Sequence, residues 1–399
     1  MQTLREEIVA LKERMVSDRR WLHQHPETGY DLPETCGYVK NRLVEMGYEP
    51  REIVESGLVC TVGDPTAGPC ILLRADMDAL PMGEQTGLPF ASTNGSMHAC
   101  GHDFHTAMLL GAAQYLKNHE GELAGCVKLM FQPDEEATDP RELLGNQAMI
   151  EAGVLENPHV DAAFGMHVCP VGVPDSTVGS IKGTSFFSVD DVEVHIQGSG
   201  AHGAQPQKGI DPLNIMSHIH LALQEVIARE VNPYEASVLT FGKMEGGTAA
   251  NIIPDQAFML GTLRTTNEET RHRLHMRIVE IVENTARAFG GAATVEFLRG
   301  LPTVWNDPDL TDELEASYEQ GAGGRILHLA EPFSGSDDFG VMSHTVPSTF
   351  FLLGCTPEGA EEIPLHNPTL VLDENALVEG AALFAAAATG WLTRHAQSE

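Results

Sequence analysis

The sequence predicts an α/β protein of two domains, in which a mixed-sheet α/β domain is interrupted by a smaller inserted domain. Three observations lead to this fold class. The chain has 399 residues, which is long for a single domain. Short apolar runs alternate with amphipathic segments at both ends of the chain, as expected of an α/β sheet. The middle of the chain follows a different order, β-α-β-β-α-β.

The first half of the chain is expected to contain an opening helix and three buried strands. Apolar residues repeat at helical spacing near the start, at Leu4, Ile8, Leu11 and Met15. The strands are expected within residues 70–80, 126–136 and 161–170, and a helix is expected from about Phe104. Ligands of α/β sheets gather beyond the carboxyl ends of the strands. The ends of these three strands are therefore candidate positions for functional side chains.

The middle segment, residues 184–299, predicts a ferredoxin-like sandwich. Its first strand alternates Val192, Val194 and Ile196 with polar residues, and Asp211 followed by a proline is typical of a helix start. Two strands, a second long helix and a last strand follow. The α/β pattern then resumes with a buried strand at 348–355 and an Ala-rich helix. We therefore assign residues 1–183 and 300–399 to the α/β domain and 184–299 to the inserted domain.

Charge and cysteine usage limit the function classes. The net charge of −33 argues against nucleic acid and against anionic membranes, because both demand an excess of Lys and Arg. We also expect no transmembrane helix, because no run of about 18 apolar residues occurs. Seven irregularly spaced cysteines do not form a disulfide framework. With a charged N-terminal segment that is unlike a signal peptide, they predict a reducing cytoplasm.

Candidate metal ligands follow several of the predicted strands. Cys100 and His102 form a "CGH" triplet, and thiolate and imidazole groups suit Zn²⁺ or a similar divalent ion. Glu136, His167 and His366 stand at other strand ends or in nearby loops. Glu135 and Glu136 are adjacent, so one carboxylate can bind metal while the other moves the proton of a water molecule. The pattern predicts metal-assisted hydrolysis.

The chain resembles the amidohydrolase branch of the aminoacylase and carboxypeptidase G metallopeptidase family, which includes hippurate hydrolases, N-acyl-amino-acid amidohydrolases and auxin-conjugate hydrolases. The resemblance extends from about Trp21 to the C-terminal helix. It rests on these segments, in family order: "RADMDALP", "MHACGHDFHTAM", "FQPDEE", "FGMHV", "GSGAHGAQPQKGIDP", "AANIIPD", "GTLRTTNEETR", "GSDDF" and "LHNP". The resemblance implies a metallopeptidase-like catalytic domain and a satellite domain through which two copies form a homodimer.

The resemblance also implies roles for individual residues. Two divalent ions are expected on Cys100, His102, Glu136, His167 and His366. The identity of the metal is open among zinc, manganese, cobalt and nickel, and the thiolate ligand favours zinc. Glu135 is expected to act as general base and then acid, and Asp76 to support a ligand. His202 is expected to stabilise the oxyanion, often from the partner subunit, and Asn251 and Arg264 to bind the free carboxylate of the substrate.

The resulting hypothesis is a two-metal enzyme that hydrolyses the amide bond of N-acyl amino acids, with metal-activated water as the nucleophile. A dipeptidase or carboxypeptidase with the same site is the main alternative. A cysteine hydrolase using Cys100 and His102 and a non-catalytic binding paralogue are further alternatives. The segment 137–149 is longer and more charged than the glycine-rich turn of many relatives, and it borders the predicted site.

Overall fold

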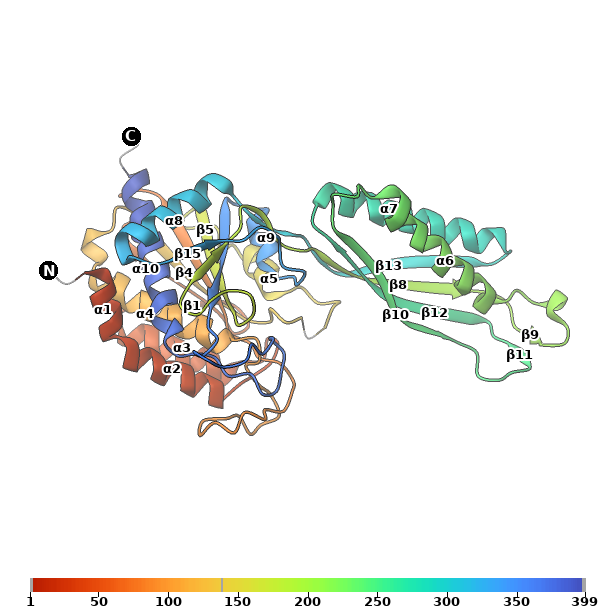
Figure 1. Cartoon of the computed structure of the whole chain (residues 1–399), viewed down its shortest axis with the longest axis horizontal. Coiled ribbons are helices and arrows are strands. Elements are labelled where there is room, and N and C mark those ends of the chain that lie inside the picture. Colours follow the sequence, from red (N-terminus) through yellow and green to blue (C-terminus); the bar gives the residue numbers. More distant parts are fainter. Residues whose placement is uncertain (1–2, 138, 397–399) are drawn as a thin grey trace.

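An eight-stranded mixed sheet lies at the centre of the larger domain in the computed structural model, which describes residues 3–137 and 139–396 (Figure 1). In spatial order its strands are β1 (Arg51–Val54), β2 (Gly57–Gly63), β4 (Cys126–Gln132), β3 (Cys70–Asp76), β5 (Ala162–Cys169), β16 (Ser348–Gly354), β6 (Val178–Ser180) and β15 (Ile326–His328). β3 pairs in parallel with β4 and β5, and β16 pairs in parallel with β5. These four strands therefore end at the same edge of the sheet.

Helices cover both faces of this sheet. Successive side chains of a strand point to opposite faces, so a strand that is apolar throughout packs against helices on both sides. In β3, Ile71 and Leu73 pack in one hydrophobic cluster with α4 (His102–Asn118) and α10 (Ala376–His395). Leu72 packs in the opposite cluster, which includes residues of α5 (Gly145–Glu151) and α9 (Phe339–Ser343). The first cluster also receives side chains from α1 (Leu4–Ala10), α2 (Lys12–Gln24), α3 (Pro33–Glu45) and α8 (Pro308–Ala322). The predicted opening helix is thus two helices, with Leu11 between them.

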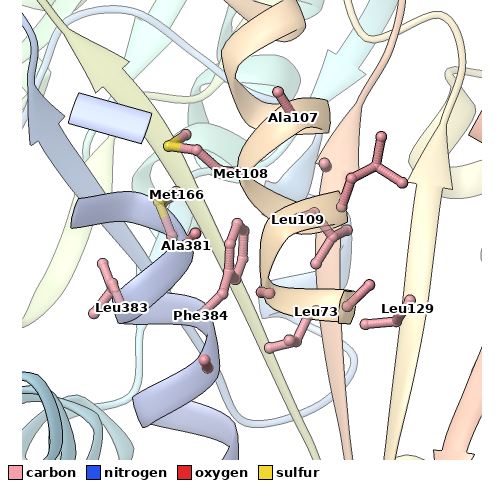
Figure 2. Packing of buried hydrophobic residues seen from close by; sticks show 14 of the residues in the cluster. Leu73, Ala107, Met108, Leu109, Leu129, Met166, Ala381, Leu383 and Phe384 are labelled. Atoms are coloured by element: carbon pink, nitrogen blue, oxygen red, sulfur yellow. The ribbon is translucent and has the colours of Figure 1, made fainter. Parts of the chain in front are cut away.

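By length and composition, α10 is the one helix of the described chain that is apolar enough to cross a membrane. The structure gives another reason for its apolar character. It packs against α4 and α8, and 78% of its most apolar window is buried inside the protein. Figure 2 shows Phe384 of α10 among the residues of this cluster, which include Leu73, Met108 and Met166. The helix is therefore part of the hydrophobic core.

The inserted domain is the ferredoxin-like sandwich that the sequence predicts. Its elements are β8 (Val189–Gln197), α6 (Pro212–Glu230), β10 (Ser237–Gly246), β12 (Gln256–Thr265), α7 (Glu268–Ala288) and β13 (Ala292–Leu301). The antiparallel sheet has the order β10-β12-β8-β13. Asp211 caps α6 by accepting hydrogen bonds from the backbone of Leu213 and Asn214. The two-domain α/β fold expected from the sequence is confirmed.

Short elements mark the two ends of the inserted domain. β7 (Gly183–Phe186) pairs with β14 (Val304–Asn306) where the two connections enter the larger domain. The proposed domain limits, residues 184 and 299, fall within β7 and β13. β9 (Ala201–His202) pairs with β11 (Ile252–Ile253) at the end of the inserted domain farthest from the large sheet (Figure 1). Two single turns of 3-10 helix complete the described elements, η1 (Glu120–Glu122) and η2 (Pro206–Lys208).

Truncating Phe384 tests the core assignment. Its ring is fully buried and lies 5.2 Å from that of Phe164, so Phe384→Ala removes apolar contacts and leaves a cavity. We expect the free energy of unfolding to fall by about 3–5 kcal/mol in a denaturant titration. Tyr234→Ala is the matched control, because that ring is 97% exposed, and equal losses for the two variants would contradict the assignment.

Candidate metal centre and active site

The turn after β4 carries the two predicted glutamates to the common edge of the sheet. Asp134 and Ala137, on either side of the pair, have positive φ values of 46° and 55°. Such left-handed backbone is uncommon outside glycine, and here it turns the chain sharply. As a result both carboxylates lie near His102, and Glu136 alone also lies beside Cys100 and His366.

The "CGH" segment approaches β5 so closely that its central residue must be glycine. Gly101 has a φ of 87°, and a Cβ atom there would lie 2.3 Å from Cγ2 of Val168. This close approach brings Sγ of Cys100 to 3.3 Å from Nε2 of His167. Sγ also lies 3.4 Å from Nε2 of His366, whose backbone is held by a hydrogen bond to Ala99.

The five predicted ligands form two groups that share the thiol of Cys100. One group is Cys100, His102 and His167, and the other is Cys100, Glu136 and His366. Within each group the ligand atoms all lie within 4.8 Å of one another. A sulfur, three imidazole nitrogens and a carboxylate are a donor set suited to zinc and similar divalent ions.

The hydrogen bonding of these residues fits a pair of cations. Nε2 of His102 is buried and makes no hydrogen bond, and Oε1 of Glu136 lies 3.3 Å from Nε2 of His366, another candidate ligand. Nδ1 of His167 donates to the carbonyl oxygen of Val168 at 2.7 Å, so its Nε2 presents a lone pair to Cys100. Buried polar atoms of this kind are costly unless a partner satisfies them. Two divalent ions bound by these five residues would supply that partner.

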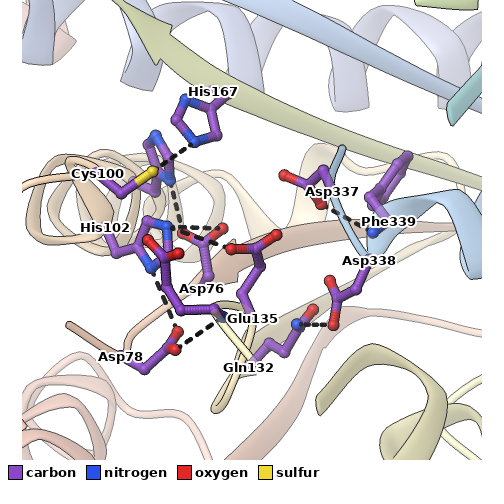
Figure 3. A network of polar contacts seen from close by, with 12 residues as sticks. Asp76, Asp78, Cys100, His102, Gln132, Glu135, His167, Asp337, Asp338 and Phe339 are labelled. Carbon is purple, nitrogen blue, oxygen red and sulfur yellow. Dashed lines mark hydrogen bonds and ion pairs between the residues drawn. The ribbon is translucent and has the colours of Figure 1, made fainter. Parts of the chain in front are cut away.

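Asp78 is a supporting residue to which the sequence analysis gave no role. Its Oδ1 lies 3.3 Å from Nδ1 of His102, and its Oδ2 accepts a hydrogen bond from the backbone nitrogen of Glu136 at 3.1 Å (Figure 3). One carboxylate thus orients two candidate ligands. The sequence signal that could have identified Asp78 was its position two residues after Asp76, at the end of a buried strand.

Asp76 supports the opposite side of the centre. Its Oδ1 lies 2.6 Å from Nδ1 of His105, and Nε2 of that histidine accepts a hydrogen bond from the backbone of Val168, next to His167. Its Oδ2 accepts a hydrogen bond from Arg74 at 2.6 Å and lies 3.8 Å from Nε2 of His102. Burial alone would raise the pKa of Asp76, but the charge of Arg74 holds it well below its usual value.

Glu135 lies in an environment suited to proton transfer. Burial raises the pKa of its carboxyl group well above the usual value, and the neighbouring carboxyls of Asp337 and Glu136 raise it further. Oε2 of Glu135 is 3.9 Å from Nε2 of His102. A carboxyl group with a raised pKa accepts and returns a proton near neutral pH more effectively than an exposed one.

One cavity of about 700 Å³ connects this cluster to the inserted domain. Its lining includes four of the five candidate ligands, Glu135 and the predicted substrate residue Arg264. His202 and Asn251 are not brought to the cavity by the same chain. Both are exposed and adjacent at the far end of the inserted domain, where the backbone of Gly203 donates to Asn251 (Figure 1).

Buried nitrogen, sulfur and oxygen donors beside a carboxyl of raised pKa, at the edge of an α/β sheet, are the parts that a metal-dependent hydrolase requires. Residues 72–390 match the model of peptidase family M20/M25/M40. The chain belongs to this family, and it is a metal-dependent hydrolase that acts on amides. This agrees with the resemblance stated from the sequence motifs.

Several relatives cover nearly the whole chain. N-acetyl-L-cysteine deacetylase of Bacillus subtilis is 37% identical over 95% of this chain and 89% of its own length. IAA-amino acid hydrolase ILR1-like 4 of Arabidopsis thaliana is 37% identical over 95% of this chain and 86% of its own. The crystal structure of a dinuclear metal-binding M20 peptidase from Bacillus subtilis has a TM-score of 0.82, at 35% identity, over 96% of this chain and 99% of that one.

The role of Asp78 is testable by metal binding. Asp78→Asn removes the negative charge that orients His102 and Glu136, so we expect metal affinity to fall by about 10- to 100-fold. Competition with a coloured chelator measures this change. Asp64→Asn, in an exposed turn, serves as the control. An affinity for metal that is unchanged in Asp78→Asn would contradict the supporting role.

Proposed function

We propose that this chain hydrolyses the amide bond of N-acyl amino acids and releases a carboxylic acid and a free amino acid. The observation that carries the proposal is the shared cavity, which combines the candidate metal centre, Glu135 and the guanidinium of Arg264. Two relatives are named for N-acetylcysteine and for an IAA-amino acid, which supports this substrate class.

The metal ligands, Glu135 and Arg264 would have separate roles in this reaction. Two divalent ions would be held by Cys100, His102, Glu136, His167 and His366. They would lower the pKa of a water molecule and polarise the scissile carbonyl. Glu135 takes a proton from the water and delivers it to the leaving nitrogen, since an amine must be protonated to leave at neutral pH. Arg264 binds the carboxylate of the amino-acid half and so fixes the position of the amide.

Arg264 is available for this role. Its Nη1 donates to the hydroxyl of Ser336 at 3.1 Å, and its Nε donates to Thr262 at 3.2 Å. Among the residues that the structure describes, no carboxylate lies within 4 Å of this guanidinium. The planar group therefore retains N–H donors, and the bidentate geometry of a carboxylate fits such donors well.

The thiol chemistry of Cys100 favours metal binding over nucleophilic attack. Burial raises the pKa of this thiol well above its usual value, and the charge of Glu136 raises it further. A nucleophile and a metal ligand both need the thiolate form, and a divalent cation bound beside Cys100 would itself supply the positive charge that lowers this pKa. A soft thiolate ligand is one reason to propose zinc as the metal, with manganese, cobalt and nickel as alternatives.

We further propose a cytoplasmic homodimer. All seven cysteines are buried and unpaired, in keeping with a reducing compartment.

In the inserted domain β10 is an edge strand, and Val238 and Met244 on it are exposed, as is Leu221 of the neighbouring α6. A second copy docked there would bring His202 and Asn251 of one chain to the cavity of the other. His202 would then stabilise the oxyanion, and Asn251 would contact the substrate carboxylate.

Glu135→Gln and chelation test the reaction. We expect Glu135→Gln to bind about as much metal as the wild type but to hydrolyse substrates about 100- to 10,000-fold more slowly, since it cannot transfer the proton. A panel of N-acetyl amino acids, hippurate and dipeptides measures the rates, and chelation of the wild type should stop turnover. Turnover that survives both treatments would exclude this mechanism. Faster cleavage of dipeptides than of N-acyl amino acids would instead favour a dipeptidase.

Mixing two inactive variants tests the contribution of the second copy. We expect His202→Ala and Glu135→Gln each to be nearly inactive alone. Refolding them together in equal amounts should restore about a quarter of the wild-type activity, because half of the dimers are mixed and each holds one intact site. If His202 acts within its own chain, or not at all, the mixture will gain no activity.

A further inference from the structure

Arg299 lies at an irregularity of β13 that directs it to the cavity. The register between β13 and β8 shifts between Leu298 and Leu301. Within this bulge Arg299 has a φ of 68° and Gly300 a φ of 61°. Bulges re-aim side chains and are common beside active sites, and left-handed backbone at a long side chain is unfavourable unless the surroundings hold it. Here the backbone nitrogen of Arg299 is held by a hydrogen bond to Pro140 at 3.0 Å.

The side chain of Arg299 lines the same cavity as Arg264 and the candidate metal ligands. Its Nε is buried and makes no hydrogen bond, and it lies 3.5 Å from Oδ2 of Asp191. Burial lowers the pKa of Arg264, Asp191 opposes that change, and the charge of Arg299 lowers the pKa further. The three charged side chains therefore interact, and together they leave one positive charge uncompensated.

The surroundings strengthen the attraction of this charge for an anion. Phe186, Phe333 and Leu301 line the same cavity, and the two phenyl rings stack with centroids 5.7 Å apart. Apolar walls exclude water and lower the local dielectric constant, so an ion pair is stronger there than on an open surface. In a protein with a net charge of −33, such a local positive charge is a specific feature of the cavity.

We propose that Arg299 is a second anion-binding residue of the substrate cleft, and that Asp191 limits the cleft to one carboxylate. Arg299 and Arg264 together bind the carboxylate of the amino-acid half, and Asp191 compensates the remaining positive charge. The preferred substrates are then N-acyl amino acids with uncharged side chains. A substrate without a carboxylate leaves the two guanidiniums without an anion. A second carboxylate finds no further uncompensated guanidinium, because Asp191 already pairs with Arg299. This inference rests on the proposed hydrolysis of N-acyl amino acids.

The first experiment compares a carboxylate with its neutral counterpart. In the metal-loaded protein, Arg299→Gln should raise KM for N-acetyl-methionine about tenfold, the lower range for a charge-assisted hydrogen bond. It should leave kcat/KM for N-acetyl-methioninamide within about twofold, since no carboxylate is present to lose that bond. Arg299→Lys should recover part of the affinity, and Arg287→Gln, on an exposed part of α7, is the control. Equal losses for the acid and the amide would overturn the proposal.

The second experiment changes the charge of the cleft in the other direction. Asp191→Asn leaves two positive charges uncompensated, so the ratio of kcat/KM for N-acetyl-aspartate to that for N-acetyl-methionine should rise about fivefold or more. An unchanged ratio would overturn the role assigned to Asp191. A circular dichroism spectrum and melting temperature like those of the wild type show that the variant is folded.

Binding to Glu135→Gln separates this inference from the proposed function. Calorimetry of that variant with N-acetyl-methionine and its amide, with and without Arg299→Gln, reports recognition of the carboxylate without turnover. If the wild type hydrolyses no member of the panel but Arg299→Gln still weakens binding of the acid alone, only the proposed function fails. If hydrolysis is observed and Arg299→Gln affects acid and amide equally, only this inference fails.

Discussion

Arg74 carries the buried positive charge around which the functional edge of the large sheet is built. Its guanidinium is fully buried and donates to Asp76 at 2.6 Å, to Asp338 at 2.8 Å and to Gln132 at 2.8 Å, while Asp337 lies 3.3 Å away. One side chain thus joins β3, β4 and the segment before α9. Removing one partner of such a buried group leaves uncompensated charge, which typically costs about 3–5 kcal/mol. Glu135 and Glu136 lie beyond the reach of its hydrogen bonds, and the cations expected at the centre would compensate the charge there.

Rigid strands and strained turns together position the residues of the cleft. The strands β3, β4, β5 and β16 fix the distances between chain segments that are far apart in sequence. Four non-glycine residues with positive φ, at 134, 137, 299 and 366, lie in or beside the segments that line the cavity. Such backbone costs about 1–3 kcal/mol for each residue and tends to concentrate at functional sites. Around one of these turns, Ala137 packs with Leu144, Val189 and Leu301 in a small apolar cluster beside the cavity.

Much of this arrangement is predictable from the sequence, because strand ends are recognisable from apolar runs that stop at polar residues. That rule singled out Glu135, Glu136 and His167, and the β-α-β-β-α-β order predicted the sheet of the inserted domain. The CGH triplet marked Cys100 and His102, and the family resemblance implied the full ligand set with His366. Contacts between distant segments were not predictable. Arg74 and Asp338 are separated by 264 positions, and nothing local marks them as partners. The irregularity of β13 at Arg299 depends on tertiary geometry, and its only signal in the sequence was the neighbouring Gly300. The distance of His202 and Asn251 from the cavity also depends on tertiary geometry, and no local signal marked it. The catalytic and ligand roles themselves stay predictions.

The central claim is that Cys100 and its four partners would hold two divalent metal ions, with the Cys100 thiolate among the ligands. X-ray absorption at the metal edge of the zinc-loaded protein tests it most directly. The account predicts a sulfur scatterer at about 2.3 Å that disappears in Cys100→Ser. It also predicts scattering from a second metal ion within about 4 Å. A spectrum with only nitrogen and oxygen neighbours, unchanged by Cys100→Ser, or one without a second metal ion, would contradict the account.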